Sequence, residues 1–280
     1  MLWESFFGYY KIVTDGRPML DRALLRLLWA EEFDHPHGLN PQVWNYDLGD
    51  GSAHGIPGWG NNEREYYIES AVTTENGLTI SAKRIPPTSG LDAYYGPAEW
   101  TSGKIHTAKK LGFKYGYLEF KARAPKGGGS WPAIWMLGSL ITELTWPTCG
   151  EIDIFEGSGN VPKTVRGTLH GPGYSGEHGV THAIDYENNL GNDFHTYGIL
   201  WNEDGFEWFF DGEPYFALTR NHPQFEGKHW PFDEEFYLII NLAIGGWFAG
   251  EVSPDLKEAQ FDVKNIYYFS YDGKGELLRH

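Results

Sequence analysis

The chain has 280 residues and a mass of 31.8 kDa, which suits one large domain or two small ones. Its formal net charge of −16 argues against nucleic acid, anionic membranes and sulfated polymers as partners, because those ligands require clustered lysine and arginine. A neutral partner is more compatible with this charge, and an acidic surface that serves only solubility is the open alternative.

The N-terminal region lacks the features of a targeting segment. No basic stretch precedes an apolar one, and the apolar run at residues 23–30 contains Arg26, so we expect neither a signal peptide nor a membrane span. Residues 1–23 are predicted to be an extension of unclear role, in which residues 5–13 have strand character. The single cysteine, Cys149, excludes an intrachain disulfide, and we expect it to be only a small residue before a strand.

From residue 24 onward, short apolar-alternating segments separated by glycine, asparagine, aspartate and proline turns predict many strands. In residues 117–123, Leu118, Phe120 and Ala122 alternate with polar neighbours, which is typical of a strand with one buried face. Further strands are predicted after Asn76-Gly77, in three segments joined at Asp204-Gly205 and Asp211-Gly212, and over residues 236–246 and 261–271. No long amphipathic helix is evident. The pattern favours an all-β, two-sheet antiparallel sandwich in which residues 24–280 form one domain.

Residues 150–157, which read G-E-I-D-I-F-E-G, break the strand period. Glu151 and Asp153 share one face, but strict alternation would turn Glu156 into the core, where an unpaired carboxylate is very costly. A β-bulge at Ile154 and Phe155 would shift the phase by one residue. The sequence therefore predicts a bulge that returns Glu156 to the face of the other two acids.

Three carboxylates on one face favour acid–base chemistry. Because like charges repel, their pKa values must separate, leaving one proton donor and one ionised group, which is the pair that glycosidic bond cleavage requires. Exposed acids without a function and a calcium site are alternatives, although the stretch lacks the spacing of a calcium loop. Trp131 and Trp135, just upstream, offer a sugar platform on a neighbouring strand.

The chain resembles glycoside hydrolase family 16, and specifically its laminarinase-like branch. The matching segments follow the order typical of that family and include LLWAEEFD, GIPGWGNNEREYY, EWTSGKIHT, KYGYLEFKARAPKG, SWPAIWMLG, CGEIDIFEG, VRGTLHGPGYSG and IINLAIGG. The resemblance implies a concanavalin A-like β-jelly roll with a long concave cleft. The ExDxxE spacing is similar to that of the bulged branch, which includes laminarinases, agarases and carrageenases.

The resemblance also implies roles for single residues. Glu151 matches the nucleophile, Asp153 the assisting carboxylate and Glu156 the general acid/base. Substrate-binding positions are matched by six residues, for each of which a purely structural role is the alternative: Asn61, Lys104, Trp131, Trp135, His170 (beside the acid/base) and Trp247. Lys104 stands where the family often has arginine, and the segment containing Trp247 is one residue shorter than usual.

No cofactor and no metal site are expected. Relatives bind a structural calcium through a glutamate like Glu32, a carbonyl near Gly77 and an aspartate whose position is occupied here by Lys264. We therefore predict that the Lys264 ammonium replaces the cation and pairs with Glu32.

The resulting expectation is a retaining endo-β-1,3-glucanase, monomeric, acting on β-glucan and not on nucleic acid or membranes. A mixed-linkage β-1,3-1,4-glucan, a galactan, or a non-catalytic role in glucan binding are the alternatives. Extracellular localisation is implied by the resemblance alone.

Overall fold

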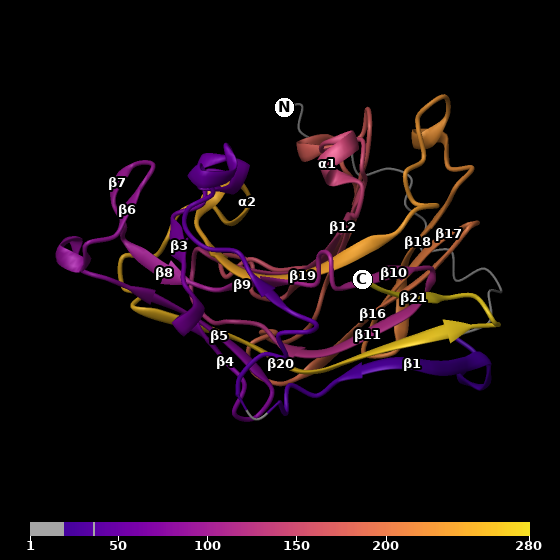
Figure 1. Ribbon diagram of the computed structural model, residues 1–280, viewed down its shortest axis with the longest axis horizontal. Helices are drawn as coiled ribbons and strands as arrows, with labels where there is room; N and C mark the ends of the chain where they lie inside the picture. Colours follow the sequence, from indigo (N-terminus) through magenta and orange to yellow (C-terminus); the bar gives the residue numbers. More distant parts are fainter. Residues whose placement is uncertain (1–19, 36) are drawn as a thin grey trace.

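The computed structural model describes residues 20–35 and 37–280, so the strand expected over residues 5–13 lies outside the described part. Figure 1 shows two large curved sheets packed face to face. The helical elements are short: two four-residue α-helices, α1 (Ile141–Leu144) and α2 (Gly246–Ala249), and the 3₁₀ turns η1 (Arg22–Leu24), η2 (Ser52–His54), η3 (Pro57–Gly60), η4 (Glu69–Ala71), η5 (Pro87–Ser89), η6 (Gly176–His178) and η7 (Pro223–Phe225). None of the helices in the described residues has the length and apolar character needed to cross a membrane.

The first sheet has ten strands, in the order β18-β17-β16-β11-β20-β5-β8-β3, with β1 beside β20 and β4 beside β5. Its strands are β1 (Leu25–Glu31), β3 (Glu65–Tyr67), β4 (Val72–Thr73), β5 (Leu78–Arg84), β8 (Trp100–Ser102), β11 (Gly116–Arg123), β16 (His195–Asn202), β17 (Gly205–Phe210), β18 (Glu213–Thr219) and β20 (Glu258–Tyr271). The three segments predicted to be joined at the two Asp-Gly turns are β16, β17 and β18.

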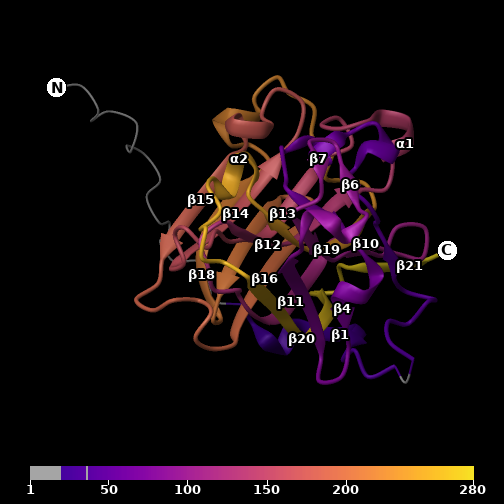
Figure 2. The same cartoon turned by 90° about the vertical axis from the view of Figure 1, so that its left-hand side faces the viewer.

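The second sheet has nine strands, in the order β15-β14-β13-β12-β19-β10-β21, with β9 beside β19 and β2 beside β9; Figure 2 shows most of this series side by side. Its strands are β2 (Asn45–Tyr46), β9 (Lys104–His106), β10 (Leu111–Lys114), β12 (Ser130–Gly138), β13 (Glu151–Glu156), β14 (Thr164–His170), β15 (Val180–Asp185), β19 (Phe236–Ile244) and β21 (Glu276–Arg279). A small hairpin, β6 (Asp92–Ala93) and β7 (Gly96–Pro97), stands apart.

Antiparallel pairing dominates, as expected: among the described strands only β3 and β8 pair in parallel. The core between the sheets is rich in aromatic rings. Phe155 of β13 packs on Tyr197 of β16 with ring centroids 4.2 Å apart, and the alternating Leu118, Phe120 and Ala122 of β11 are buried as predicted. The fold is therefore the all-β sandwich that the sequence indicates.

The predicted ion pair between Lys264 and Glu32 does not form. Among the residues described here, Lys264 forms no ion pair with Glu32, whose Oε1 instead accepts a hydrogen bond of 2.6 Å from the Tyr267 hydroxyl. The backbone of Lys264 does pack on Gly77, because a Cβ added to that glycine would lie 3.1 Å from the Lys264 Cα. A lysine ammonium in place of an aspartate carboxylate removes one oxygen ligand from the calcium site that the resemblance implies.

Candidate active site

The predicted bulge lies on β13. Against β12, Ile134 pairs with Phe155 and the next residue, Trp135, pairs with Asp153. Against β14, Gly167 alone faces the two residues Ile154 and Phe155. The sequence prediction is thus confirmed: both bulged side chains are buried, and Glu156 leaves the core.

The bulge is held from the opposite sheet. The Trp208 indole of β17 donates a hydrogen bond of 2.9 Å to the backbone carbonyl of Asp153. Gly167, opposite the bulge, leaves room for this ring, since a Cβ there would lie 2.5 Å from the indole. The strand that carries the acids is therefore fixed by a side chain that crosses the core.

Strand register places one row of side chains along the outer face of the nine-stranded sheet. Residues paired across the strands share a face, and the row through the third acid reads Arg166, Glu156, Ala133, Asn241 and Lys104. In Figure 1 this face lies between two raised segments that carry α1 and α2. All three acids are thus brought to one surface.

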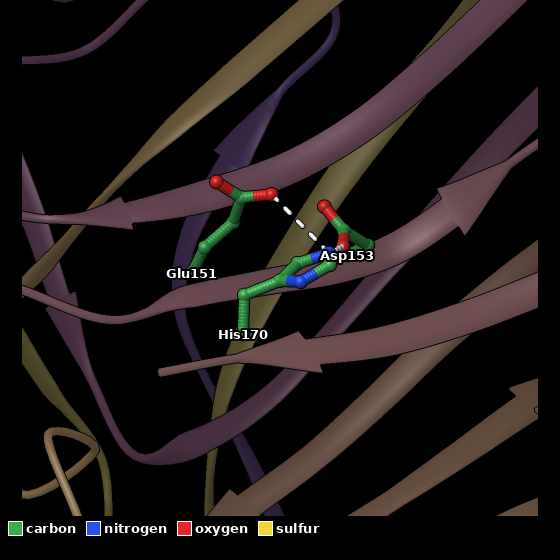
Figure 3. A group of neighbouring side chains, drawn as sticks. All are labelled: Glu151, Asp153 and His170. Carbon is green, nitrogen blue, oxygen red and sulfur yellow. Dashed lines mark ion pairs between the residues drawn. The ribbon is translucent and has the colours of Figure 1, made fainter. Parts of the chain in front are cut away.

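Glu151 and Asp153 meet His170, which is the partner of Glu151 on β14; Figure 3 shows the three side chains converging. The His170 Nε2 lies 3.1 Å from Asp153 Oδ2 and 3.6 Å from Glu151 Oε1. On the other side, the Trp146 indole donates a hydrogen bond of 2.8 Å to Glu151 Oε2. His170 is therefore in direct contact with Glu151 and Asp153, and its charge also acts on Glu156, the acid beside which it was expected.

Glu156 lies against Trp131 of β12, whose indole donates a hydrogen bond of 3.2 Å to Glu156 Oε1. Trp131 is itself stacked on Phe248 of α2, with ring centroids 4.8 Å apart and planes 25° apart. The Arg166 guanidinium lies 4.9 Å from the centre of the Phe248 ring. An aromatic stack thus orients the third acid.

The surroundings of the acids give them different pKa values. Burial and the negative charge of Asp153 raise the pKa of Glu156 to about 8. Burial lowers the pKa of His170, but the charges of Glu151 and Asp153 outweigh it and raise that pKa to about 9. Burial also raises the pKa of Glu151, and the His170 cation opposes this rise. At neutral pH Glu156 is mostly protonated, while Glu151 faces a cation and an indole donor.

Asp153 is only 3% exposed. Burial and the charge of Glu151 raise its pKa to about 6, against the lowering effect of His170. Because His170 keeps its proton above pH 7, the two form a charged pair under neutral conditions. Asp153 therefore places a negative charge beside both glutamates.

Of the other candidate residues, Trp135 and Lys104 lie on the same outer face. Trp135 donates a hydrogen bond of 2.8 Å to Asn241 Oδ1. Lys104 is only 8% exposed; its Nζ lies 3.3 Å from Asp47 Oδ2 and 4.0 Å from the centre of the Trp59 ring. The ammonium is therefore already engaged by groups within the protein.

Asn61 and Trp247 lie together at the edge of this face. The Asn61 side chain donates a hydrogen bond of 3.0 Å to Glu63 Oε1, and its carbonyl accepts one of 2.9 Å from the Trp247 backbone. Trp247 is 75% exposed. The Trp247 side chain is therefore open to solvent beside Asn61.

Sequence reasoning missed Trp146, Arg166 and Asn241. Asn241 had a signal, being the one polar residue in the apolar run of β19. Trp146 and Arg166 had none, because no pattern shows that the loop turns Trp146 back onto Glu151 or that strand register pairs Arg166 with Glu156. Cys149 is buried, as expected, and burial raises its pKa to about 11.

One group in the described residues could hold a metal ion: Glu151, Asp153 and His170 offer ligand atoms within 4.8 Å of one another. At neutral pH His170 is a cation, and both of its ring nitrogens carry a proton. The group therefore fits an internal ion pair better than a metal site.

Comparison with known proteins gives a consistent result. The model of the family described as "Glycosyl hydrolases family 16" matches residues 61–265. The laminarinase catalytic domain of Thermotoga maritima superposes with a TM-score of 0.83 at 40% identity, over 88% of this chain and 98% of that one. A beta-glucanase of Rhodothermus marinus is 36% identical, over 88% of this chain and 85% of its own length.

Glucan endo-1,3-beta-glucosidase A1 of Niallia circulans is 35% identical over 88% of this chain, which spans only 38% of that longer protein. The family match covers most of the chain, and it includes the strand with the three acids. This chain belongs to family 16 of the glycosyl hydrolases.

Proposed function

We propose that the protein is a retaining endo-β-1,3-glucanase that cleaves internal bonds of β-glucans. The observation that carries this proposal is the bulged strand β13, which brings Glu151, Asp153 and Glu156 to one face and gives them unequal environments. Relatives named as laminarinases and endo-1,3-beta-glucanases support the choice of β-1,3 linkages.

Glu156 is the group suited to donate a proton, because its pKa of about 8 keeps it protonated at neutral pH. In the first step it protonates the glycosidic oxygen while the Glu151 carboxylate attacks the anomeric carbon, which breaks the glycosidic bond and forms a glycosyl–enzyme ester. In the second step Glu156, now ionised, takes a proton from water, and the resulting hydroxide displaces Glu151. Two inversions leave the product in the β configuration.

Asp153 and His170 set the protonation states of Glu151 and Glu156 for these two steps. The His170 cation, 3.6 Å from Glu151 Oε1, favours the ionised nucleophile. Asp153 supports the cation and raises the pKa of Glu156 through its charge. When Glu151 becomes an ester it loses its charge, so the pKa of Glu156 falls and Glu156 stays ionised as the base of the second step.

Sugar rings are bound, in this proposal, by Trp131, Trp135 and Trp247 through their indole faces and by Asn61 through hydrogen bonds. We propose action outside the cell, because a polysaccharide is too large to cross a membrane unaided. A monomer without affinity for nucleic acid stays a prediction from the acidic composition.

The function is tested with purified protein on laminarin, lichenan and agarose, with the products sized over time. We expect fast internal cleavage of laminarin and a β-anomer as the first product seen by proton NMR. Glu151→Gln and Glu156→Gln should each lower kcat by several orders of magnitude, roughly 10³-fold or more, whereas the exposed Glu177→Gln should not. Preferred cleavage of lichenan or agarose, an α-anomer as first product, or near-normal hydrolysis by Glu151→Gln would contradict the proposal.

A further inference from the structure

Glu63 is a buried acid outside the group of three that performs the chemistry. It is 5% exposed and lies two residues before β3, which belongs to the ten-stranded sheet. Its Oε1 accepts a hydrogen bond of 3.0 Å from the Asn61 side chain, and its Oε2 accepts one of 3.2 Å from the Tyr67 hydroxyl. Both carboxylate oxygens are thus used as acceptors within the protein.

The first branch from Glu63 leads to Trp135. The Tyr67 hydroxyl, while donating to Glu63, accepts a hydrogen bond of 3.1 Å from Asn241 Nδ2. Asn241 Oδ1 in turn accepts the bond of 2.8 Å from the Trp135 indole. Tyr67 and Asn241 are 1% and 7% exposed, so water does not compete for these bonds.

A second set of contacts, which backbone atoms make and a change of the Glu63 side chain leaves in place, leads to Trp131 and so to Glu156. Glu63 forms a β-bridge with Gly245, and the Trp247 backbone donates to the Asn61 carbonyl over 2.9 Å. These contacts fix α2 against the segment with Asn61. The approach is close: a Cβ on Gly246 would lie 2.9 Å from the Asn61 carbonyl oxygen. Phe248 of the same turn stacks on Trp131, which holds Glu156.

We propose that Glu63 is a positioning residue, whose carboxylate fixes Asn61 and, through Tyr67 and Asn241, the Trp135 indole in the orientation in which they bind the sugar chain. The proposal rests on the proposed function in one respect only, that these two side chains face a glucan. The carboxylate accepts from the amide through one oxygen and from the phenol through the other. An amide in its place would set an N–H group against one of those donors, and leaving a buried partner unsatisfied has a cost of about 1–3 kcal/mol.

Glu63→Gln is the test, with the exposed Glu69→Gln as the matched control on the same segment. Using laminarihexaose, we expect Glu63→Gln to raise KM about tenfold while kcat changes less than about threefold, because binding groups are misplaced but the reacting acids stay. Glu69→Gln should leave both constants unchanged. Equal KM values for Glu63→Gln and wild type, in a protein with an unchanged circular dichroism spectrum, would overturn the proposal.

A double-mutant cycle separates positioning from a general structural role. If Glu63 acts through Asn61, its replacement should cost much less in an Asn61→Ala background than in wild type, since coupled sites are not additive. Fully additive effects would overturn the proposed route. Tyr67→Phe, which removes one hydroxyl, carries the same test on the Trp135 branch should Glu63→Gln fail to fold.

A crystal structure of Glu63→Gln gives a readout that does not depend on activity. We expect the Asn61 amide or the Trp135 indole to rotate from its present position, and an unchanged arrangement of both would refute the inference. Absence of laminarin cleavage by the wild type would contradict the proposed function instead, and the crystallographic result would still decide the positioning role.

Discussion

At the scale of single residues, chemical roles follow from what each carboxyl touches. Glu151 and Glu156 have the same side chain and each accepts an indole N–H, yet Glu151 lies 3.6 Å from the His170 nitrogen, while the charge of Asp153 raises the pKa of Glu156. The second is therefore the group that we propose as the proton donor. The alkaline limb of the pH–rate profile should therefore report the pKa of Glu156.

The Trp131→Phe substitution should move this alkaline limb to higher pH. The indole N–H stabilises the ionised form of Glu156 and so lowers its pKa. Phenylalanine keeps a ring for stacking on Phe248 but has no donor, so the pKa of Glu156 should rise. In a pH profile of kcat/KM we expect the alkaline limb to move to higher pH than in wild type. A limb that stays in place or moves to lower pH would be inconsistent with this contact.

At the scale of elements, the extra residue in β13 sets the spacing between Glu151 and Glu156. Deleting Ile154 would restore a regular strand in which the three acids still alternate with buried residues, so the face is kept and the spacing shortened. Since a misplacement of 1 Å can cost about 10²-fold in rate, we expect kcat to fall at least about 100-fold.

The control for this deletion is Ile154→Ala, which keeps the bulge and removes only the buried side chain. Both variants should lose stability, by about 2–5 kcal/mol for the substitution, but the substitution should retain most of its kcat. Equal kcat values for the two variants would show that the bulge has no catalytic importance.

The position of Glu156 could be predicted from the sequence because one strong rule, that an unpaired charge avoids the core, decided it. The strands and their turns followed from similarly local patterns. The contact of Asn241 with Trp135 could not, since it depends on how separate strands meet. The contacts of Trp146 and Glu63 are local in sequence, but they depend on loop conformations that no sequence pattern indicated. The predicted Lys264–Glu32 ion pair was wrong because opposite charges alone do not show which other partners compete. Here the Tyr267 hydroxyl donates a hydrogen bond to Glu32.

At the scale of the whole molecule, buried carboxyls make stability depend on pH. Burial and the charge of Glu63 raise the pKa of Glu65, which is 1% exposed, well above its ordinary value of 4.5. The folded state then holds a proton that the unfolded chain releases above pH 4.5, so stability from this group is full below that pH and is lost as pH rises towards the raised pKa.

Glu65→Gln mimics the protonated acid and cannot ionise. We expect its melting temperature, relative to wild type, to increase as pH rises from 5 to 8, with the largest advantage at pH 8. Differential scanning fluorimetry across that range checks this. A difference between the two proteins that does not change with pH would mean that Glu65 keeps its ordinary pKa.

The position at which relatives are expected to bind calcium is altered in this chain. Lys264 lies beside Gly77, and the Tyr267 hydroxyl donates to one carboxylate oxygen of Glu32. These contacts weigh against a need for calcium. We propose that the fold stands without it. The melting temperature should be the same in calcium and in a chelator, and a rise of several degrees in calcium, or tight binding by calorimetry, would refute this.

The indole that crosses the core from β17 to the carbonyl of Asp153 has a practical consequence. The catalytic strand takes its shape from a residue on the opposite sheet and from the bare glycine across from the bulge. Transplanting the three acids onto another sandwich would therefore not carry the site with them. A designer would have to move Trp208 and Gly167 as well, so the smallest portable unit of this enzyme spans both of its layers.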